Sequence, residues 1–126
     1  MQELAAVKYE LKKSRFFVHL YLIEYPDEFH EIISLHQKKY KKAAHHCAAM
    51  NLRMADGKLF EEYKNDGEVG HPGRTLHNLL VTNGLESHAI IVSRVFGGIK
   101  LGPSGVTRAF RDSGDAAIKY YQETLK

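Results

Sequence analysis

The stretch HAIIVSRVFGGIKLGPSG, from His88 to Gly105, decides the fold of this chain. Its first half is a nearly continuous apolar run, which favours a strand at the centre of a sheet that can be covered on both faces. Its second half holds four glycines between Gly97 and Gly105, a density that indicates unusual backbone angles or close backbone contacts. An apolar stripe at helical spacing follows from about Pro103 to Leu125. The stretch is therefore predicted to connect a buried strand to a long helix.

Outward from this stretch, hydrophobic periodicity and turn signals predict the remaining elements. In chain order they are strands at about 7–11 and 16–23, a helix at about 27–40, strands at 43–54 and 58–63, and a helix that begins at Pro72 and ends at Asn83-Gly84. The order β-β-α-β-β-α-β-α predicts one α+β domain over residues 1–126. We expect a two-layer sandwich in which a mixed sheet of about five strands carries the helices on one face.

Composition narrows the class of protein. The chain has 126 residues, of which 44% are hydrophobic and 26% charged, as in an ordinary soluble domain rather than a disordered chain. No apolar run is long enough to span a membrane, and the start lacks the features of a signal peptide. The single cysteine, Cys47, excludes an internal disulfide framework. We therefore expect a cytoplasmic protein without a membrane partner.

Positive charge is modest in total but clustered along the chain. The formal net charge is +3, and one cluster consists of Lys38, Lys39, Lys41 and Lys42 around Tyr40. Such a cluster is either a solvated helix end or a surface that contacts phosphate groups. Nothing in the pattern is specific for DNA.

The glycine-dense connection is a candidate anion site. Backbone amides at the start of a helix attract negative groups, and Lys100 lies inside this loop between Arg94 and Arg108. The loop does not match the phosphate-binding patterns Gly-x-x-x-x-Gly-Lys-[Ser/Thr] or Gly-x-Gly-x-x-Gly. A purely structural tight connection is the alternative.

Catalytic and metal-binding signals are weak. Asp66 and Glu68 near a histidine are able to perform acid–base chemistry, or they cap the following helix and pair with Arg74 or Arg94. Adjacent strand residues such as His46 and Cys47 point to opposite faces, so a metal site is not expected there. We assign no catalytic residue, no metal ligand and no cofactor from the sequence.

Several motifs occur in an order that resembles a known family. They are Lys13-Ser14-Arg15-Phe16, Ala44-His45-His46-Cys47, Asp66-Gly67-Glu68, and Arg94-Val95-Phe96-Gly97-Gly98-Ile99-Lys100-Leu101-Gly102 followed by Gly105 and Arg108-Ala109-Phe110. The chain resembles the IMPACT family, which includes the bacterial YigZ proteins, from about Lys13 to Ala117. It departs from the family in having Val95 after the arginine and a shorter segment at 69–73.

The resemblance implies a fold like domain two of ribosomal protein S-five, a superfamily that tolerates a left-handed β-α-β crossover. It implies regulation of translation, with contact to RNA, the ribosome or a translation-regulatory protein partner. It also marks residues that we expect to line one concave surface for a ligand or partner: His45, Asp66, Glu68, Arg94, Gly97, Gly98, Lys100, Gly102 and Arg108. The lysines at 38, 39, 41 and 42 are the expected nucleic-acid contacts.

Two functions remain open from the sequence. The first is a non-catalytic regulatory module linked to translation, which binds RNA, the ribosome or a translation factor. The alternative is an enzyme or a protein that binds a small ligand or phosphate. Such a protein would use a cleft of His45, Asp66, Glu68, Arg94 and Lys100.

Overall fold

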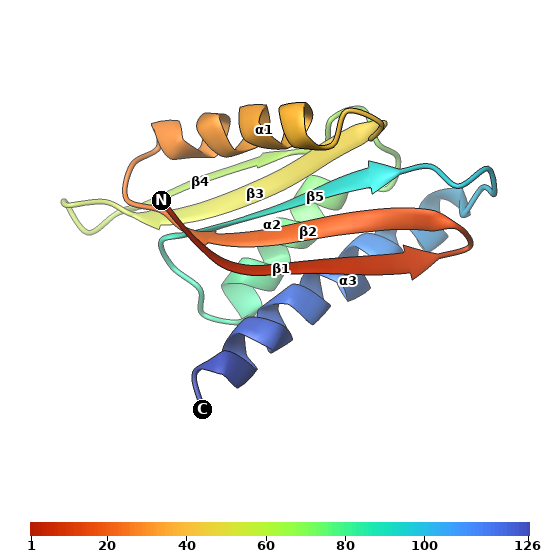
Figure 1. Cartoon of the computed structure of the whole chain (residues 1–126). Helices are drawn as coiled ribbons and strands as arrows, with labels where there is room; N and C mark the ends of the chain where they lie inside the picture. The colour runs from red at the N-terminus through yellow and green to blue at the C-terminus, as the bar shows by residue number, and fades with distance from the viewer.

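The computed structural model describes residues 1–126 and contains five strands and three helices (Figure 1). In chain order they are β1 (Gln2–Leu11), β2 (Ser14–Leu22), α1 (Asp27–Lys39), β3 (His45–Arg53), β4 (Leu59–Lys64), α2 (Pro72–Thr82), β5 (His88–Val95) and α3 (Gly102–Thr124). All eight predicted elements are present, and the α+β class is confirmed. None of the helices combines the length and the apolar character that crossing a bilayer requires.

The five strands form one sheet in the order β1-β2-β5-β3-β4. Strand β5 lies in the middle, as its apolar run predicts. Every neighbouring pair is antiparallel, so the expectation of a mixed sheet is wrong. The parallel strands joined through α1 and α2 are not neighbours, because an antiparallel strand lies between the members of each pair.

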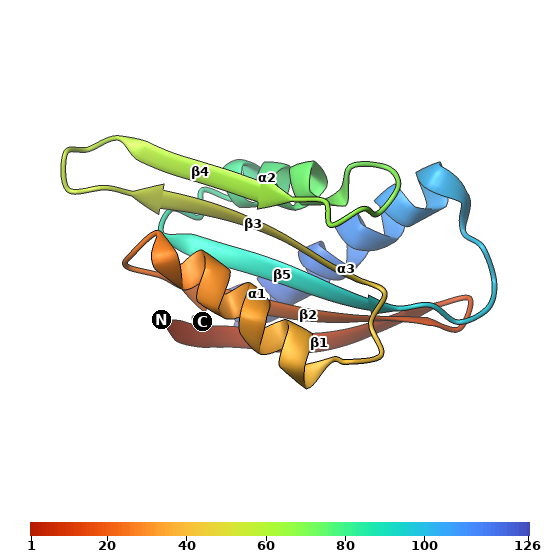
Figure 2. The same ribbon diagram turned by 90° about the horizontal axis from the view of Figure 1, so that it is seen from above.

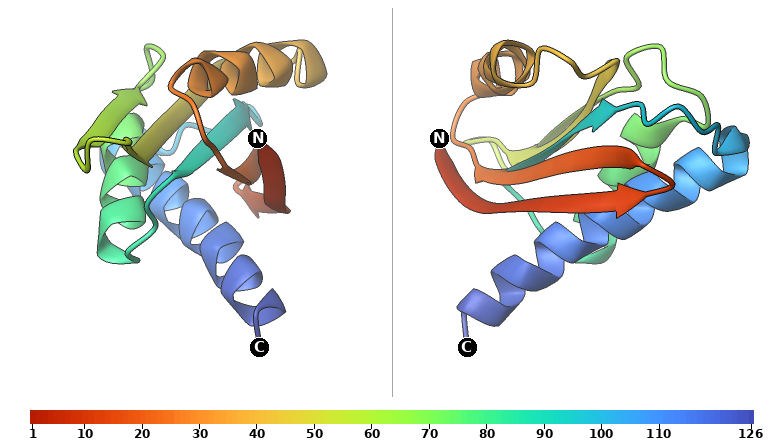
Figure 3. Two further views of the ribbon diagram at one scale, coloured as in Figure 1. Left: turned by 90° about the vertical axis from the view of Figure 1, so that its left-hand side faces the viewer. Right: turned by 45° about the vertical axis from the view of Figure 1, so that its right-hand side comes forward.

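Helices cover both faces of the sheet (Figures 1 and 3). Ile90 and Val92 of β5 belong to the core beneath α2 and α3, whereas Ala89 and Ile91 belong to the core beneath α1. The expected two-layer sandwich with helices on one face is therefore wrong, and the molecule has three layers. The physical reason is the strand itself, since a strand that is apolar on both faces needs cover on both.

The two crossover connections have opposite hands. Both join parallel strands that are separated by one intervening strand, but α1 and α2 lie on opposite faces of the sheet. Seen from the side of α1 in Figure 2, the connection β2-α1-β3 is right-handed, and the connection β4-α2-β5 is left-handed. The left-handed crossover departs from the general rule and agrees with the fold that the resemblance implies.

Gly114 lets α3 approach α2. A Cβ atom at this position would lie 2.8 Å from Cδ1 of Leu79 and 3.0 Å from Cδ2 of Leu76. The sequence predicts a close approach to the sheet here, but the nearest side chains belong to the neighbouring helix. The cost of glycine within a helix, about 1 kcal/mol, is offset by this packing.

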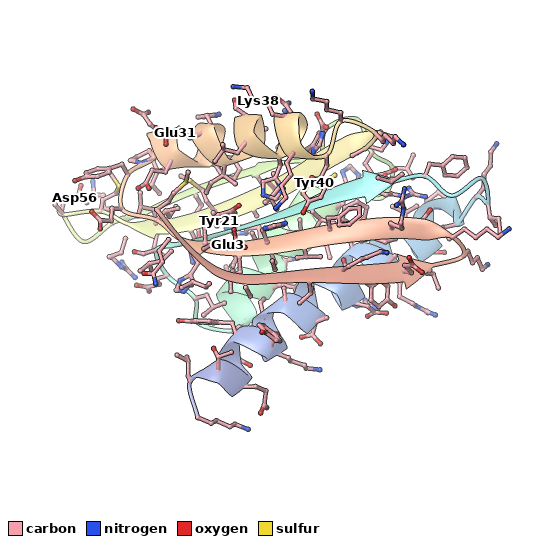
Figure 4. All side chains as sticks on the ribbon, viewed as in Figure 1. Glu3, Tyr21, Glu31, Lys38, Tyr40 and Asp56 are labelled. Atoms are coloured by element: carbon pink, nitrogen blue, oxygen red, sulfur yellow. The ribbon has the colours of Figure 1, made fainter.

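A polar network fills part of the space between α1 and the sheet. The hydroxyl of Tyr21 lies 2.9 Å from Nε2 of His36, and the hydroxyl of Tyr40 lies 2.6 Å from Nε2 of His19. Figure 4 shows both tyrosines between the helix and the strands, whereas Lys38 projects away from the sheet. Both histidines are buried. Burial lowers the pKa of His36 to about 3 and also lowers that of His19.

Candidate functional site

A buried ion pair joins β5 to the loop at 65–71. Nη1 of Arg94 donates to Oε2 of Glu68 at 2.8 Å, and the two side chains are 7% and 4% exposed. The guanidinium carbon of Arg94 lies 5.6 Å from the ring centre of Phe16, which is fully buried. The ion pair therefore borders the core beneath α3, and Glu68 pairs with Arg94 rather than with Arg74.

Hydrogen bonds connect the same loop to the start of β3. Nδ1 of His45 donates to the carbonyl oxygen of Asp66 at 2.8 Å, and the amide of His46 donates to Oδ2 of Asp66 at 2.7 Å. Nε2 of His45 lies 3.7 Å from Oε2 of Glu68. The structure thus brings His45, Asp66, Glu68 and Arg94 into one contiguous cluster, in which each side chain already contacts another part of the protein.

Gly97 fits against the turn between β1 and β2. Its amide donates to Oγ of the buried Ser14 at 3.3 Å. A Cβ atom on Gly97 would lie 2.5 Å from the backbone nitrogen of Ser14 and even closer to the carbonyl group of Lys13. The glycine is thus required by a backbone contact that no side chain can accommodate. Gly98 and Gly102 instead adopt φ angles of +89° and +73°, which favour glycine.

Replacing Gly97 with alanine is expected to lower the free energy of unfolding by about 1 to 3 kcal/mol. The methyl group would overlap the backbone of Lys13 and Ser14, which has no freedom to rotate away. Chemical denaturation of both proteins measures the difference. The matched control is Gly105→Ala, because the nearest atom to a Cβ there is Cβ of Leu101 at 3.3 Å. Equal effects of the two substitutions would contradict this explanation.

A hollow of about 320 Å³ opens between the loop and the start of α3, and we call it the β5–α3 hollow. It is lined by Val69, Arg94, Phe96, Lys100, Leu101, Gly102, Pro103 and Val106. Three of the expected site residues, Arg94, Lys100 and Gly102, therefore share this surface. Gly98 and Arg108 do not line it, and Arg108 is exposed on α3.

Contacts between the loop and α3 shape this hollow. The hydroxyl of Thr107 donates to the carbonyl oxygens of Gly70 and Pro103, at 2.9 and 3.0 Å. A Cβ atom on Gly70 would lie 2.8 Å from the carbonyl oxygen of Pro103. The side of the hollow formed by Val69 is therefore fixed by close backbone packing.

A second hollow, of about 400 Å³, lies on the opposite face of the same sheet end, and we call it the lysine hollow. It is lined by Arg15, Phe17, Lys38, Lys39, Tyr40, Lys41, Lys42 and Val95. The rings of Tyr40 and Phe17 are stacked, with centres 4.5 Å apart and planes 18° from parallel. Tyr40 packs inward, as its place on the helix stripe predicts. All four lysines expected to contact nucleic acid share this surface.

The cations of the lysine hollow are unpaired. None of its four lysines, nor Arg15, forms an ion pair with a carboxylate, whereas Lys8, Lys119 and Lys126 each do. The hollow is consequently a concentrated positive surface around an aromatic pair. The two hollows share no residue, because the consecutive residues Arg94 and Val95 point to opposite faces of the sheet.

Sequence reasoning missed the apolar members of both hollows. Phe17 and Val95 belong to the lysine hollow, and Val69, Phe96 and Leu101 belong to the β5–α3 hollow. Strand alternation could have placed Arg15 and Phe17 on one face. Val95 lies beside them because β5 pairs with β2, and Arg15 faces Val95 in that pairing. That pairing leaves no local signal in the sequence.

Cys47 and the possible metal ligands are the remaining candidates for chemistry. The thiol of Cys47 donates to the carbonyl oxygen of Asn65 at 3.2 Å, and burial raises its pKa. This keeps the thiol protonated and poorly nucleophilic. No group of three or more histidine, cysteine, aspartate or glutamate side chains is arranged to hold a metal ion.

Comparison with known proteins places these features in a family. The model of the Impact N-terminal domain matches residues 12–118. IMPACT family member YvyE of Bacillus subtilis is 34% identical over 111 residues, which cover 87% of this chain and 50% of that protein. Protein IMPACT of Homo sapiens is 32% identical over 95 residues, which cover 73% of this chain and 29% of that protein. The chain thus spans half the length, or less, of these relatives.

Solved structures share the fold. A crystal structure of a hypothetical protein aligns with a TM-score of 0.84 and 27% identity, over 91% of this chain and 56% of that one. The two-domain translational regulator Yih1 aligns with a TM-score of 0.60 and 17% identity, over 95% of this chain and 46% of that one. At that identity, the second likeness shows the fold alone.

Proposed function

This chain belongs to the IMPACT family, and from that premise we propose that it is a non-catalytic regulatory module of translation that binds RNA through the lysine hollow. Yih1, which shares the fold, is described as a translational regulator. We propose the same setting, with a cytoplasmic location, for this chain. The observation that carries the proposal is the set of five unpaired cations around the stacked rings of Phe17 and Tyr40.

The chemistry of the lysine hollow matches an RNA backbone better than a protein surface. Each unpaired lysine gains by replacing the counterions of a phosphate group, and closely spaced cations meet successive phosphates. Aromatic rings beside such cations offer a surface for unpaired bases. Tyr40 already uses one ring face against Phe17, so we assign it to shaping the hollow and assign the binding energy to the lysines.

The test is a filter-binding titration with ribosomal or transfer RNA over a range of salt concentrations. Replacing Lys38, Lys39, Lys41 and Lys42 with alanine is expected to weaken binding and to flatten the plot of log affinity against log salt. Each lost phosphate contact lowers the slope by about 0.7 to 0.9, so four lost contacts lower it by about 3. The variant should stay folded, because exposed lysines usually tolerate substitution within about 0.5 kcal/mol each.

The matched control removes the same charge elsewhere. Alanine at Lys8, Lys58, Lys119 and Lys126 changes the net charge equally but leaves the lysine hollow intact. We expect this control to retain most of the affinity and most of the salt slope. If the wild-type protein and the hollow variant bind RNA equally weakly, without a salt slope, RNA binding fails and a protein partner becomes the leading candidate.

A further inference from the structure

The rim of the β5–α3 hollow exposes large apolar side chains. Val69 and Phe96 line the hollow and are each 50% exposed, and the neighbouring Ile99 is 42% exposed. Leu101, Pro103 and Val106 continue the apolar lining. Three large apolar side chains exposed around one concave surface favour an interaction site over an ordinary surface.

Positive charge converges on the same hollow. Lys100 is exposed and forms no ion pair. The first turn of α3 contains no acidic residue and no side-chain cap, so its free amides and the helix dipole favour an anion there. Arg94 also lines the hollow, but it is only 6% exposed and is paired with Glu68. Lys100 is therefore the free cation beside the uncapped start of α3.

The mixture of apolar surface and a single free lysine distinguishes this hollow from the lysine hollow. An RNA backbone needs several unpaired cations, but Arg94 is already compensated by Glu68. A ligand that carries a carboxylate beside an aromatic or aliphatic side chain complements both the free lysine and the apolar rim of the hollow. We propose that the β5–α3 hollow docks an acidic, apolar-bearing peptide segment of a protein partner, with a carboxylate at Lys100 and the α3 N-terminus and an apolar side chain against Phe96 and Val69.

Fluorescence anisotropy with a labelled peptide of sequence Ser-Glu-Phe-Glu-Leu-Ser tests this proposal. We expect saturable binding to the wild-type protein, and roughly tenfold weaker binding when glutamine replaces both glutamates, since a charge-assisted hydrogen bond is lost. Alanine in place of Phe and Leu should weaken binding by a similar factor. Lys100→Glu and Phe96→Ser change exposed side chains and should each lower the affinity roughly tenfold, while circular dichroism stays unchanged.

The matched control is Lys58→Glu, which makes the same charge change in the β3–β4 turn at the other end of the sheet (Figure 2). We expect this control to bind the peptide like the wild type. The proposal is overturned if the wild type does not bind the acidic peptide, if the glutamine peptide binds equally well, or if Lys100→Glu retains full affinity. It is also overturned if Lys100→Glu and Phe96→Ser weaken RNA binding instead, because the hollow would then belong to a nucleic-acid surface.

Discussion

Replacing Arg94 with alanine is expected to lower the free energy of unfolding by about 3 to 5 kcal/mol. The carboxylate of Glu68 is 4% exposed, and without the guanidinium it would remain buried without its 2.8 Å ion-pair partner. An uncompensated buried charge is far more costly than the loss of an exposed ion pair. His45, whose Nε2 lies 3.7 Å from Oε2 of Glu68, is too distant to replace the lost hydrogen bond. Urea denaturation monitored by circular dichroism measures the change.

Two controls separate the lost charge pair from a general loss of packing. Replacing both Arg94 and Glu68 with methionine removes the pair together and should recover most of the lost stability. Arg53→Ala breaks the exposed ion pair with Glu86 and should change stability little. The explanation fails if Arg94→Ala is no more destabilising than Arg53→Ala.

Local patterns were sufficient to predict the secondary-structure elements. The apolar run from Ala89 to Val92 indicated a central strand, and the structure places it between β2 and β3. The face on which each crossover helix packs was not predictable from those patterns. The stripe of Phe29 and Ile32 on α1 shows which side of the helix is buried but does not show which face of the sheet covers it. That choice depends on contacts between segments far apart in the chain.

The candidate site was predictable in its members but not in its contacts. The motif residues Glu68 and Arg94 could be singled out, but whether Glu68 pairs with Arg74 or Arg94 depends on the path of its loop. That path includes positive φ angles at Asp66, Gly70 and His71, which only the assembled structure shows. The lysine hollow was likewise only partly predictable. Its four lysines are close in sequence, whereas Arg15 and Val95 lie beside them because β2 pairs with β5.

Acidification is expected to destabilise the protein through the histidines beneath α1. Burial, reinforced by the neighbouring His19, His46 and Lys39, lowers the pKa of His36 from its ordinary value of 6.5 to about 3. The folded state thus keeps His36 neutral, while the unfolded chain binds a proton below pH 6.5. The contribution of neutral His36 to the free energy of unfolding is fully present above pH 6.5 and is lost progressively as the pH falls toward 3. The loss reaches about 1.4 kcal/mol per pH unit, or about 5 kcal/mol in total.

The contribution of His36 is isolated by comparing how the free energy of unfolding depends on pH in the wild type and in His36→Gln. Burial also lowers the pKa values of His19 and His46, so the wild-type stability curve should fall more steeply than one proton allows. Glutamine does not titrate, so the curve of His36→Gln, measured by urea denaturation from pH 7 to pH 4, should be shallower by roughly one proton. The exposed His30 provides the control, and His30→Gln should leave the slope unchanged. An unchanged slope in His36→Gln would mean that protonation of other groups destabilises the fold, and that the contacts of His36 with Tyr21 and Ser93 persist in acid.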